Sequence, residues 1–266
     1  MKKEDFVVRF AGEGGQGFLS AAGGFASANT AGGYHSQTFA TFPSQITGGP
    51  TWMQARISTN PILSSGDALD VLVVFTEDAY ETHRYEVKND GVILYDSEKL
   101  HIEDTGKIKS LGIPFEKLGK STGNPRAANM VMMGALAQLV NMPQSILEAF
   151  VKRRWSNTAR YGEKVVPQNI QALSLGRDAA VESGFALGKL EEPVPPRYKQ
   201  IFINGNEAIC LGAAAVGLEF YVGYPISPAT TILIWMENNL VRPGKFAYQV
   251  SSEIESITSV IGASYA

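Results

Sequence analysis

The chain has 266 residues, of which 44% are hydrophobic and 18% charged, and its formal net charge is −3 at pH 7. This length suits one large or two moderate domains with a full apolar core. The acidic balance argues against general nucleic-acid binding, which needs a basic surface. The first residues lack the apolar core of a signal peptide, and no apolar run is long enough to cross a bilayer, so we expect no membrane association.

Cysteine occurs once, as Cys210, within an apolar stretch. The chain therefore forms no internal disulfide and cannot by itself ligate an iron–sulfur cluster through cysteines. The three histidines, His35, His83 and His101, do not have the spacing of metal ligands. We expect a reducing, cytoplasmic location and no metal site on this chain.

The first half of the chain alternates between strand and helix patterns. The expected strands are residues 6–10, 34–42, 52–57, 71–75 and 91–95, and the expected helices are residues 18–31 and 78–88. Such alternation predicts an α/β sandwich with a mostly parallel sheet. Three further helices are expected at 124–140, 143–152 and 167–183, the last of them beginning at Pro167.

Residues 190–200 contain three prolines and predict a stiff linker between two domains. We place the first domain at 1–189 and the second at 201–266, where two strong strands and a weak third follow. The expected last helix, from about Ser252, has no closing Gly or Pro, so we expect this domain to be incomplete. A natural short protein whose last helix docks on the first domain is the alternative.

A glycine-rich turn follows the first expected strand. Gly12, Gly14 and Gly17 match the G-x-G-x-x-G pattern between a strand and a helix, where the backbone can approach a phosphate closely. A dinucleotide site also needs an acidic residue about 20 positions later for the ribose. No Asp or Glu occurs between Gly14 and Gly66, and Arg56 is the only Lys or Arg there, so NAD(P) is disfavoured.

Two strand-to-helix junctions stand out in the second domain. Tyr224 ends a short apolar strand, and Ser227 and Pro228 suit the N-cap and the first position of a helix. Free backbone N–H groups at such a junction bind small anions. The second junction follows the strand 246–250 and places Glu253 and Glu255 in the first turn of a helix.

The run NGNEAICLGAAAVGLEFYVGYPISPAT, from Asn204 to Thr230, resembles the α subunit of 2-oxoacid:ferredoxin oxidoreductases, especially of the 2-oxoglutarate type. GEGGQG together with ITGGPTWMQARIS is similar to the γ module of the same enzymes. Two positions depart from the family pattern: Ser227 stands where threonine is usual, and Thr47 where an RGG pattern has arginine. The resemblance implies a γ-type α/β sandwich followed by the start of a thiamine-diphosphate fold of the pyrimidine-binding type.

The resemblance also implies a reaction. A 2-oxo acid would be decarboxylated oxidatively, its acyl group passed to coenzyme A and the electrons to ferredoxin. Thiamine diphosphate would be shared with a β subunit, which would also carry Mg²⁺ and a [4Fe-4S] cluster, so we expect a hetero-oligomer. Pyruvate, 2-oxoglutarate and branched-chain 2-oxo acids remain open as substrates, with 2-oxoglutarate preferred.

By the same resemblance, Glu253 is the acid at the pyrimidine N1′ atom, with Glu255 as its competitor, and both could instead serve only the helix dipole. We expect residue 253 beside the turn at residue 227 and shielded from bulk solvent. The expected substrate contacts are Tyr224, Pro225, Ser227 and Pro228, with an ordinary serine cap as the alternative for Ser227. The residues expected to contact coenzyme A or shape its channel are Gly12, Gly14, Gly15, Gln16, Gly17, Gly48 and Gly49.

Several alternatives stay open. The glycine loop is a tight turn if it has no ligand, and Asn206 and Glu207 either serve the active site or cap a helix. The basic run Lys152–Trp155 is a helix end or a docking patch for an acidic carrier or for coenzyme A phosphates. Rival functions are a non-catalytic assembly module and a nucleotide-binding reductase that uses the glycine loop.

Overall fold

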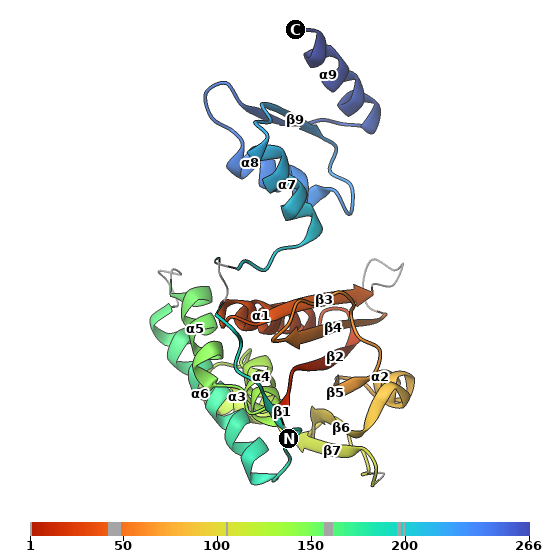
Figure 1. Ribbon diagram of the computed structural model, residues 1–266, viewed down its shortest axis with the longest axis vertical. Helices are drawn as coiled ribbons and strands as arrows, with labels where there is room; N and C mark the ends of the chain where they lie inside the picture. The colour runs from red at the N-terminus through yellow and green to blue at the C-terminus, as the bar shows by residue number, and fades with distance from the viewer. Residues whose placement is uncertain (1, 42–48, 105, 157–161, 196–197, 199) are drawn as a thin grey trace. The chain divides into compact units, whose positions relative to one another are not determined.

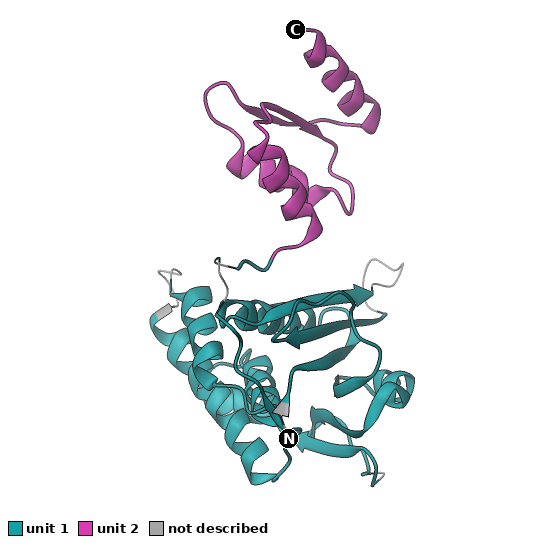
Figure 2. Ribbon diagram, viewed as in Figure 1, with its two compact units in different colours: residues 1–202 teal, residues 203–266 magenta. Residues whose placement is uncertain are grey.

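The structure is a computed structural model that describes every residue except 1, 42–48, 105, 157–161, 196, 197 and 199. The chain divides into two compact units, Met1–Phe202 and Ile203–Ala266, which Figure 2 shows in different colours.

Unit 1 is built on a six-stranded sheet with the order β3-β4-β2-β5-β6-β7 (Figure 1). Strands β2, β5, β6 and β7 run parallel, while β4 is antiparallel to both β2 and β3. The mostly parallel α/β architecture predicted from the sequence is confirmed. The strands are β2 (Asp5–Glu13), β3 (His35–Thr41), β4 (Pro50–Ser58), β5 (Leu69–Val74), β6 (Val87–Asp96) and β7 (Lys109–Ile113).

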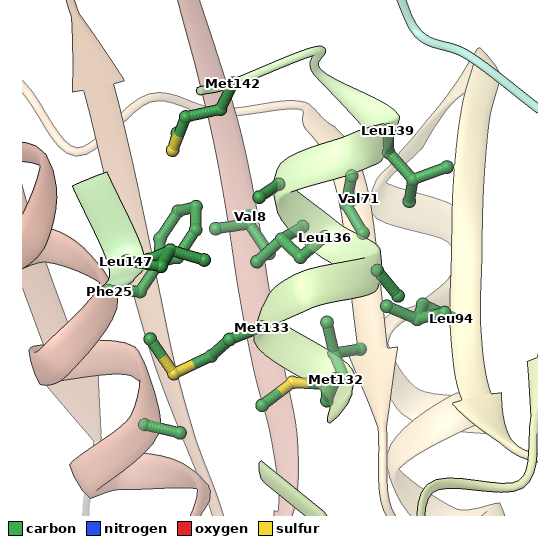
Figure 3. Packing of buried hydrophobic residues seen from close by; sticks show 14 of the residues in the cluster. Val8, Phe25, Val71, Leu94, Met132, Met133, Leu136, Leu139, Met142 and Leu147 are labelled. Atoms are coloured by element: carbon green, nitrogen blue, oxygen red, sulfur yellow. The ribbon is translucent and has the colours of Figure 1, made fainter. Parts of the chain in front are cut away.

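The central strands are apolar on both faces because both faces are covered. In β2, Val8 faces the larger core, and its neighbour Val7 faces a smaller core on the opposite side of the sheet. Figure 3 shows Val8, Val71 and Leu94 beneath helix α4 (Ala128–Leu139), whose Met132 and Leu136 pack toward them.

Helices α1, α3, α4, α5 and α6 belong to the larger core, and α2 to the smaller one. The remaining bounds in unit 1 are β1 (Lys2–Lys3), α1 (Phe18–Ala31), α2 (Glu77–His83), the 3₁₀ turn η1 (Arg84–Glu86), α3 (Phe115–Ser121), α5 (Gln144–Trp155), α6 (Gly162–Glu182) and β8 (Lys189–Leu190).

Several expected boundaries in unit 1 differ from the structure. The helix expected at 78–88 ends at His83, because the chain passes through η1 directly into β6. Helix α6 begins at Gly162 rather than at Pro167, which lies inside the helix. Leu190, the first residue of the expected linker, belongs to β8, which pairs with β1.

Unit 2 consists of α7 (Gly205–Ala215), β9 (Phe220–Gly223), α8 (Thr230–Asn239), β10 (Phe246–Gln249) and α9 (Glu253–Tyr265). Strands β9 and β10 pair in parallel. Its small core contains Cys210, Met236 and Leu240. The weak strand expected at its start does not form, since residues 201–204 have no strand pairing.

Candidate functional site

The glycine loop joins β2 to α1 in unit 1. Gly15 and Gly17 have φ values of 96° and 79°, a backbone conformation that side chains with a Cβ rarely adopt. Gly17 is the N-cap of α1, so the first backbone N–H groups of that helix, which have no partner within the helix, face the loop. The loop therefore has the backbone geometry expected of an anion-binding turn.

Gln16 closes the loop from within. Its side-chain oxygen accepts a hydrogen bond from the backbone N–H of Glu13 at 2.9 Å. A Cβ at Gly12 would collide with this side chain and would lie 2.8 Å from the Cβ of Phe75. Gly12 and Gln16, both expected to contact a ligand, thus have structural roles that hold the turn.

The predicted pair Gly48 and Gly49 has one described residue, Gly49, and this residue contacts the glycine loop. Gly14 donates its backbone N–H to the carbonyl of Gly49 at 3.2 Å, so Gly49 lies beside the loop. Gly48, the other predicted residue of this pair, lies outside the described residues, as does Thr47.

In unit 2, the two strand-to-helix junctions share one edge of the β9–β10 pair. Gln249 pairs with Gly223 at the carboxyl ends of the two parallel strands, and the backbone N–H of Val250 donates to the carbonyl of Gly223 at 3.1 Å. The segment carrying Ser227 follows β9, and the segment carrying Glu253 follows β10. The pairing therefore brings both predicted segments to the same end of the small sheet.

The first junction differs from the predicted helix start. Helix α8 begins at Thr230 with Ala229 as its N-cap, so Ser227 is not a cap and Pro228 is not its first residue. Residues 227–229 form a separate turn, and the Ser227–Pro228 peptide bond is cis. Ser227, Pro225 and Pro228 are exposed, and Tyr224 is half-buried.

Asn206 holds this turn in place. Its side-chain amide donates to the carbonyl of Pro228 at 2.9 Å and to the Thr231 hydroxyl at 2.8 Å. Its neighbour Glu207 has the capping role instead, in a capping box with Asn204. The capping option left open for this pair thus applies to Glu207, and no feature of the sequence predicted the contact of Asn206 with Pro228.

The second junction separates the two competing acids. The Glu255 carboxylate accepts from the Ser251 backbone N–H at 2.9 Å and from the Ser251 hydroxyl at 2.6 Å. These two hydrogen bonds, the hydroxyl's first, lower the pKa of Glu255 below its ordinary value. The Glu255 carboxylate therefore stabilises the start of α9 through its hydrogen bonds with Ser251. Ser252, the N-cap, accepts from the Glu255 backbone N–H.

Glu253 is the first residue of α9, and its carboxylate has no hydrogen-bond or ion-pair partner among the described residues. Its side chain is exposed, which differs from the expected shielding. The reason is that no element of unit 2 covers the start of α9, a helix with no buried residue. Burial of this carboxylate would have to come from outside unit 2.

Metal and membrane features are absent from the described part of the chain. Within it, no group of three or more His, Cys, Asp and Glu side chains is arranged to hold a metal ion. None of its helices is long and apolar enough to cross a membrane.

Two family models match the chain. Residues 7–179 match "Pyruvate ferredoxin/flavodoxin oxidoreductase", and residues 211–266 match "Pyruvate flavodoxin/ferredoxin oxidoreductase, thiamine diP-bdg". Together they cover the glycine loop, the turn at Ser227 and the start of α9.

Individual relatives agree with the family models. The chain is 26% identical to the 2-oxoglutarate oxidoreductase subunit KorA of Mycobacterium tuberculosis, over 98% of this chain and 45% of the relative. It is similar to a solved 2-oxoglutarate:ferredoxin oxidoreductase from Magnetococcus marinus with 2-oxoglutarate, coenzyme A and succinyl-CoA bound. That similarity has a TM-score of 0.86 and 32% identity, over 99% of this chain and 46% of the other.

A γ subunit of a keto/oxoacid ferredoxin oxidoreductase from Geobacter sulfurreducens shares the fold of the first unit, with a TM-score of 0.55 at 24% identity over 66% of this chain. The chain spans less than half of the length of the Mycobacterium and Magnetococcus relatives. It belongs to the pyruvate ferredoxin/flavodoxin oxidoreductase family, with a γ-type module and a thiamine-binding α module fused in one polypeptide.

Proposed function

We propose that this chain is a subunit of a 2-oxoacid:ferredoxin oxidoreductase that oxidises 2-oxoglutarate and transfers the acyl group to coenzyme A. The choice of 2-oxoglutarate is supported by the Mycobacterium and Magnetococcus relatives, both of which are named as 2-oxoglutarate oxidoreductases. Thiamine diphosphate, when bound, supplies the electron sink for decarboxylation.

One observation supports the proposal most strongly. The turn at Ser227 and the carboxylate of Glu253 follow two paired parallel strands at the same sheet edge. Glu253 would hold the pyrimidine N1′ atom, because Glu255 already accepts two hydrogen bonds from Ser251. The Ser227 hydroxyl and the neighbouring exposed turn would contact the carboxylate or the 2-oxo group of the substrate.

A partner chain is part of the proposal. Both Ser227 and Glu253 are exposed in this chain, while a thiamine site needs a dry cleft around the reacting atoms. We infer that a β subunit covers this edge of the β9–β10 pair and supplies the diphosphate and Mg²⁺ half of the site. The same subunit would carry the [4Fe-4S] cluster that passes electrons to ferredoxin, because this chain has a single cysteine.

The test is the activity of the complex purified with its partner subunit. A panel of 2-oxo acids is assayed with a viologen dye, and 2-oxoglutarate is expected to give the highest kcat/KM. Glu253→Gln should remove most turnover while the complex still assembles. Glu255→Gln is the matched control, two residues away on the same helix turn, and should keep most of the activity.

Two results would contradict this proposal. Loss of turnover in Glu255→Gln but not in Glu253→Gln would transfer the role to the other acid. A purified complex without 2-oxo acid oxidation would favour a non-catalytic assembly module.

A further inference from the structure

The edge of unit 2 that carries Ser227 and Glu253 has no cationic side chain in its own segments. Residues 204–231 and 250–256, which include both strand-to-helix junctions and the start of α7, contain no Lys, Arg or His. A 2-oxo acid is an anion, so within these segments only backbone N–H groups, side-chain amides and hydroxyls can donate hydrogen bonds to it. The side-chain donors that are still unpaired at this edge are therefore the candidates for binding the substrate.

Other polar side chains at this edge already have partners. The Asn206 amide donates one hydrogen bond to the Pro228 carbonyl and another to the Thr231 hydroxyl. The Ser251 hydroxyl donates to the Glu255 carboxylate. These donors hold the two turns in place, so they could bind a substrate only by releasing a turn.

The hydroxyl of Tyr221, in β9, is a donor without such a partner. The side chain is half-buried, and its hydroxyl forms no hydrogen bond with the described residues. Buried tyrosine hydroxyls usually have a partner, so this one remains available to a ligand. Burial first, and then the nearby Cys210, raise the pKa of the Tyr221 phenol above its ordinary value of 10.0. The hydroxyl therefore keeps its proton at neutral pH and can donate it in a hydrogen bond.

The Tyr221 hydroxyl lies at the end of β9. Tyr221 and Gly223 are two positions apart in the strand and so share one face of it. A Cβ on Gly223 would be 2.8 Å from the hydroxyl oxygen, so the tyrosine side chain extends along the strand to its last residue. Gly223 pairs with Gln249, and its carbonyl accepts from the Val250 backbone N–H. The hydroxyl is therefore at the sheet edge from which the segments of Ser227 and Glu253 depart.

The glycine at position 223 is explained by this hydroxyl. Gly223 is not among the glycines with a positive φ, so its backbone conformation does not require glycine. The three nearest atoms to a Cβ there all belong to Tyr221, namely Oη at 2.8 Å, Cε1 at 3.0 Å and Cζ at 3.2 Å. A glycine within a strand often marks a close approach of another group. Here the missing side chain leaves room for the end of Tyr221.

We propose that Tyr221 is a further substrate-binding residue, whose hydroxyl donates a hydrogen bond to a carboxylate of the 2-oxo acid. This inference rests on the proposed function and extends its site from the exposed turn at Ser227 to the face of β9 that packs with Cys210 and Met236 of α7 and α8. A hydroxyl that donates to a carboxylate forms a charge-assisted hydrogen bond, which is stronger than one between neutral groups. Tyr221 thus supplies part of the anion binding that no cation of these segments provides.

The first test measures binding of glutarate, an unreactive dicarboxylate, to the complex purified with its partner subunit, by calorimetry. Tyr221→Phe keeps the ring and removes only the hydroxyl, so the Kd should rise by roughly tenfold. Tyr248→Phe is the matched control, because Tyr248 is an exposed tyrosine of β10 that is paired with Val222 and so lies on the opposite face of the strand pair. An unchanged Kd in Tyr221→Phe, or an equal rise in both variants, would overturn the proposal.

Gly223→Ala tests the position of the hydroxyl without altering Tyr221. The added methyl group displaces the hydroxyl from the strand end, and the Kd for glutarate should rise as in Tyr221→Phe. The Tm of the complex should stay the same, since only the end of one side chain has to move. Unchanged affinity in this variant, or a parallel fall in Tm and affinity, would count against the proposed contact.

Steady-state kinetics identify which carboxylate is bound. Tyr221→Phe should raise KM more than it lowers kcat, because a binding contact is lost from the bound substrate and the transition state alike. A rise in KM for 2-oxoglutarate alone assigns the contact to the carboxylate far from the oxo group. Equal rises for all accepted 2-oxo acids assign it to the carboxylate beside the oxo group. A lower kcat with an unchanged KM would overturn the binding role.

Two results separate this contact from the proposed function. A complex that oxidises 2-oxoglutarate with the same KM in wild type and Tyr221→Phe would refute the contact alone. A complex that oxidises no 2-oxo acid, but loses affinity for glutarate in Tyr221→Phe, would refute the proposed function alone.

Discussion

Asn206 and Pro228 are 22 positions apart, and the side-chain amide of the first donates to the backbone carbonyl of the second at 2.9 Å. The same amide group donates to the Thr231 hydroxyl. One side chain at the start of α7 thereby holds both sides of the turn that precedes α8. Because Ser227 lies in this turn, Asn206 is a positioning residue for the proposed substrate contact.

We expect Asn206→Asp to raise the KM for the 2-oxo acid more than it lowers kcat. Aspartate has the same shape but cannot donate either hydrogen bond, and each lost bond costs about 1 kcal/mol. The comparison is made by steady-state kinetics of the assembled complex. Asn238→Asp is the control, since the Asn238 amide donates only within α8, to the carbonyl of Ile234. Equal kinetic effects in both variants would remove the positioning role.

The start of α9 should depend on pH through Glu255. Its pKa is lowered below the ordinary value of 4.5, so its contribution to the helix start is present above that value and lost as the pH falls through the lower, folded-state pKa. Hydrogen exchange at the Ser251 amide should therefore show protection near neutral pH that weakens in acid. Glu255→Gln should remove the pH dependence, and Glu253→Gln should preserve it. A Ser251 amide equally protected in wild type and Glu255→Gln would contradict this account.

Residue types and spacing predicted the candidate residues, but tertiary contacts determine how these residues are held. A strand followed by Ser-Pro predicted an N-cap at Ser227, and the structure instead has a separate turn because Asn206 holds Pro228 from another helix. The resemblance favoured Glu253 but left Glu255 as a competitor. The hydrogen bonds of Glu255 to Ser251 distinguish them, and these depend on how the chain leaves β10.

Asp70 links three segments of unit 1 and should make its stability sensitive to acid. The carboxylate, only 1% exposed, pairs with Lys3 at 2.6 Å and Lys88 at 3.0 Å, and accepts from the Val7 backbone N–H at 2.9 Å. Burial alone would raise the pKa of Asp70, but these hydrogen bonds outweigh it and lower the pKa below 3.8. The stabilisation is therefore complete above that ordinary value and is lost as the pH falls through the folded-state pKa.

Asp70→Asn should destabilise unit 1 by about 3 kcal/mol at neutral pH, near the low end for a broken buried ion pair because Lys88 is partly solvated. The free energy of unfolding in urea measures this at about pH 7 and again at about pH 3. The difference from wild type should shrink in acid, because the wild-type carboxylate becomes protonated. The exposed Asp90→Asn serves as control and should change stability little at either pH. A difference that stays constant with pH would exclude the carboxylate as its cause.

Periodicity in the sequence predicted helices near α4 and α6, and the described residues confirm both. It did not predict that they pack against each other, because a glycine within a helical pattern signals only a cost in stability. The strand β7 and the helix α3 were missed for a related reason. Both are short, and residues such as Leu111 and Phe115 become recognisable as core only through contacts made by the folded chain.

The close crossing of α4 and α6 should tolerate no side chain at Gly134 or Gly176. A Cβ on Gly134 would overlap the Leu173 carbonyl oxygen and lie 2.8 Å from its carbon, and one on Gly176 would lie 2.6 Å from the Val131 carbonyl carbon. Both obstacles are helix backbone, so the helices must separate to admit a methyl group.

We expect Gly134→Ala and Gly176→Ala each to lower the free energy of unfolding by about 3 kcal/mol, at the upper end for overpacked cores. Gly23→Ala, with open space around its methyl group, is the control and should raise stability by about 0.5 to 1 kcal/mol. Thermal unfolding of the three variants is the measurement, and a Gly134→Ala chain as stable as wild type would contradict the close approach of α4 and α6 at this glycine.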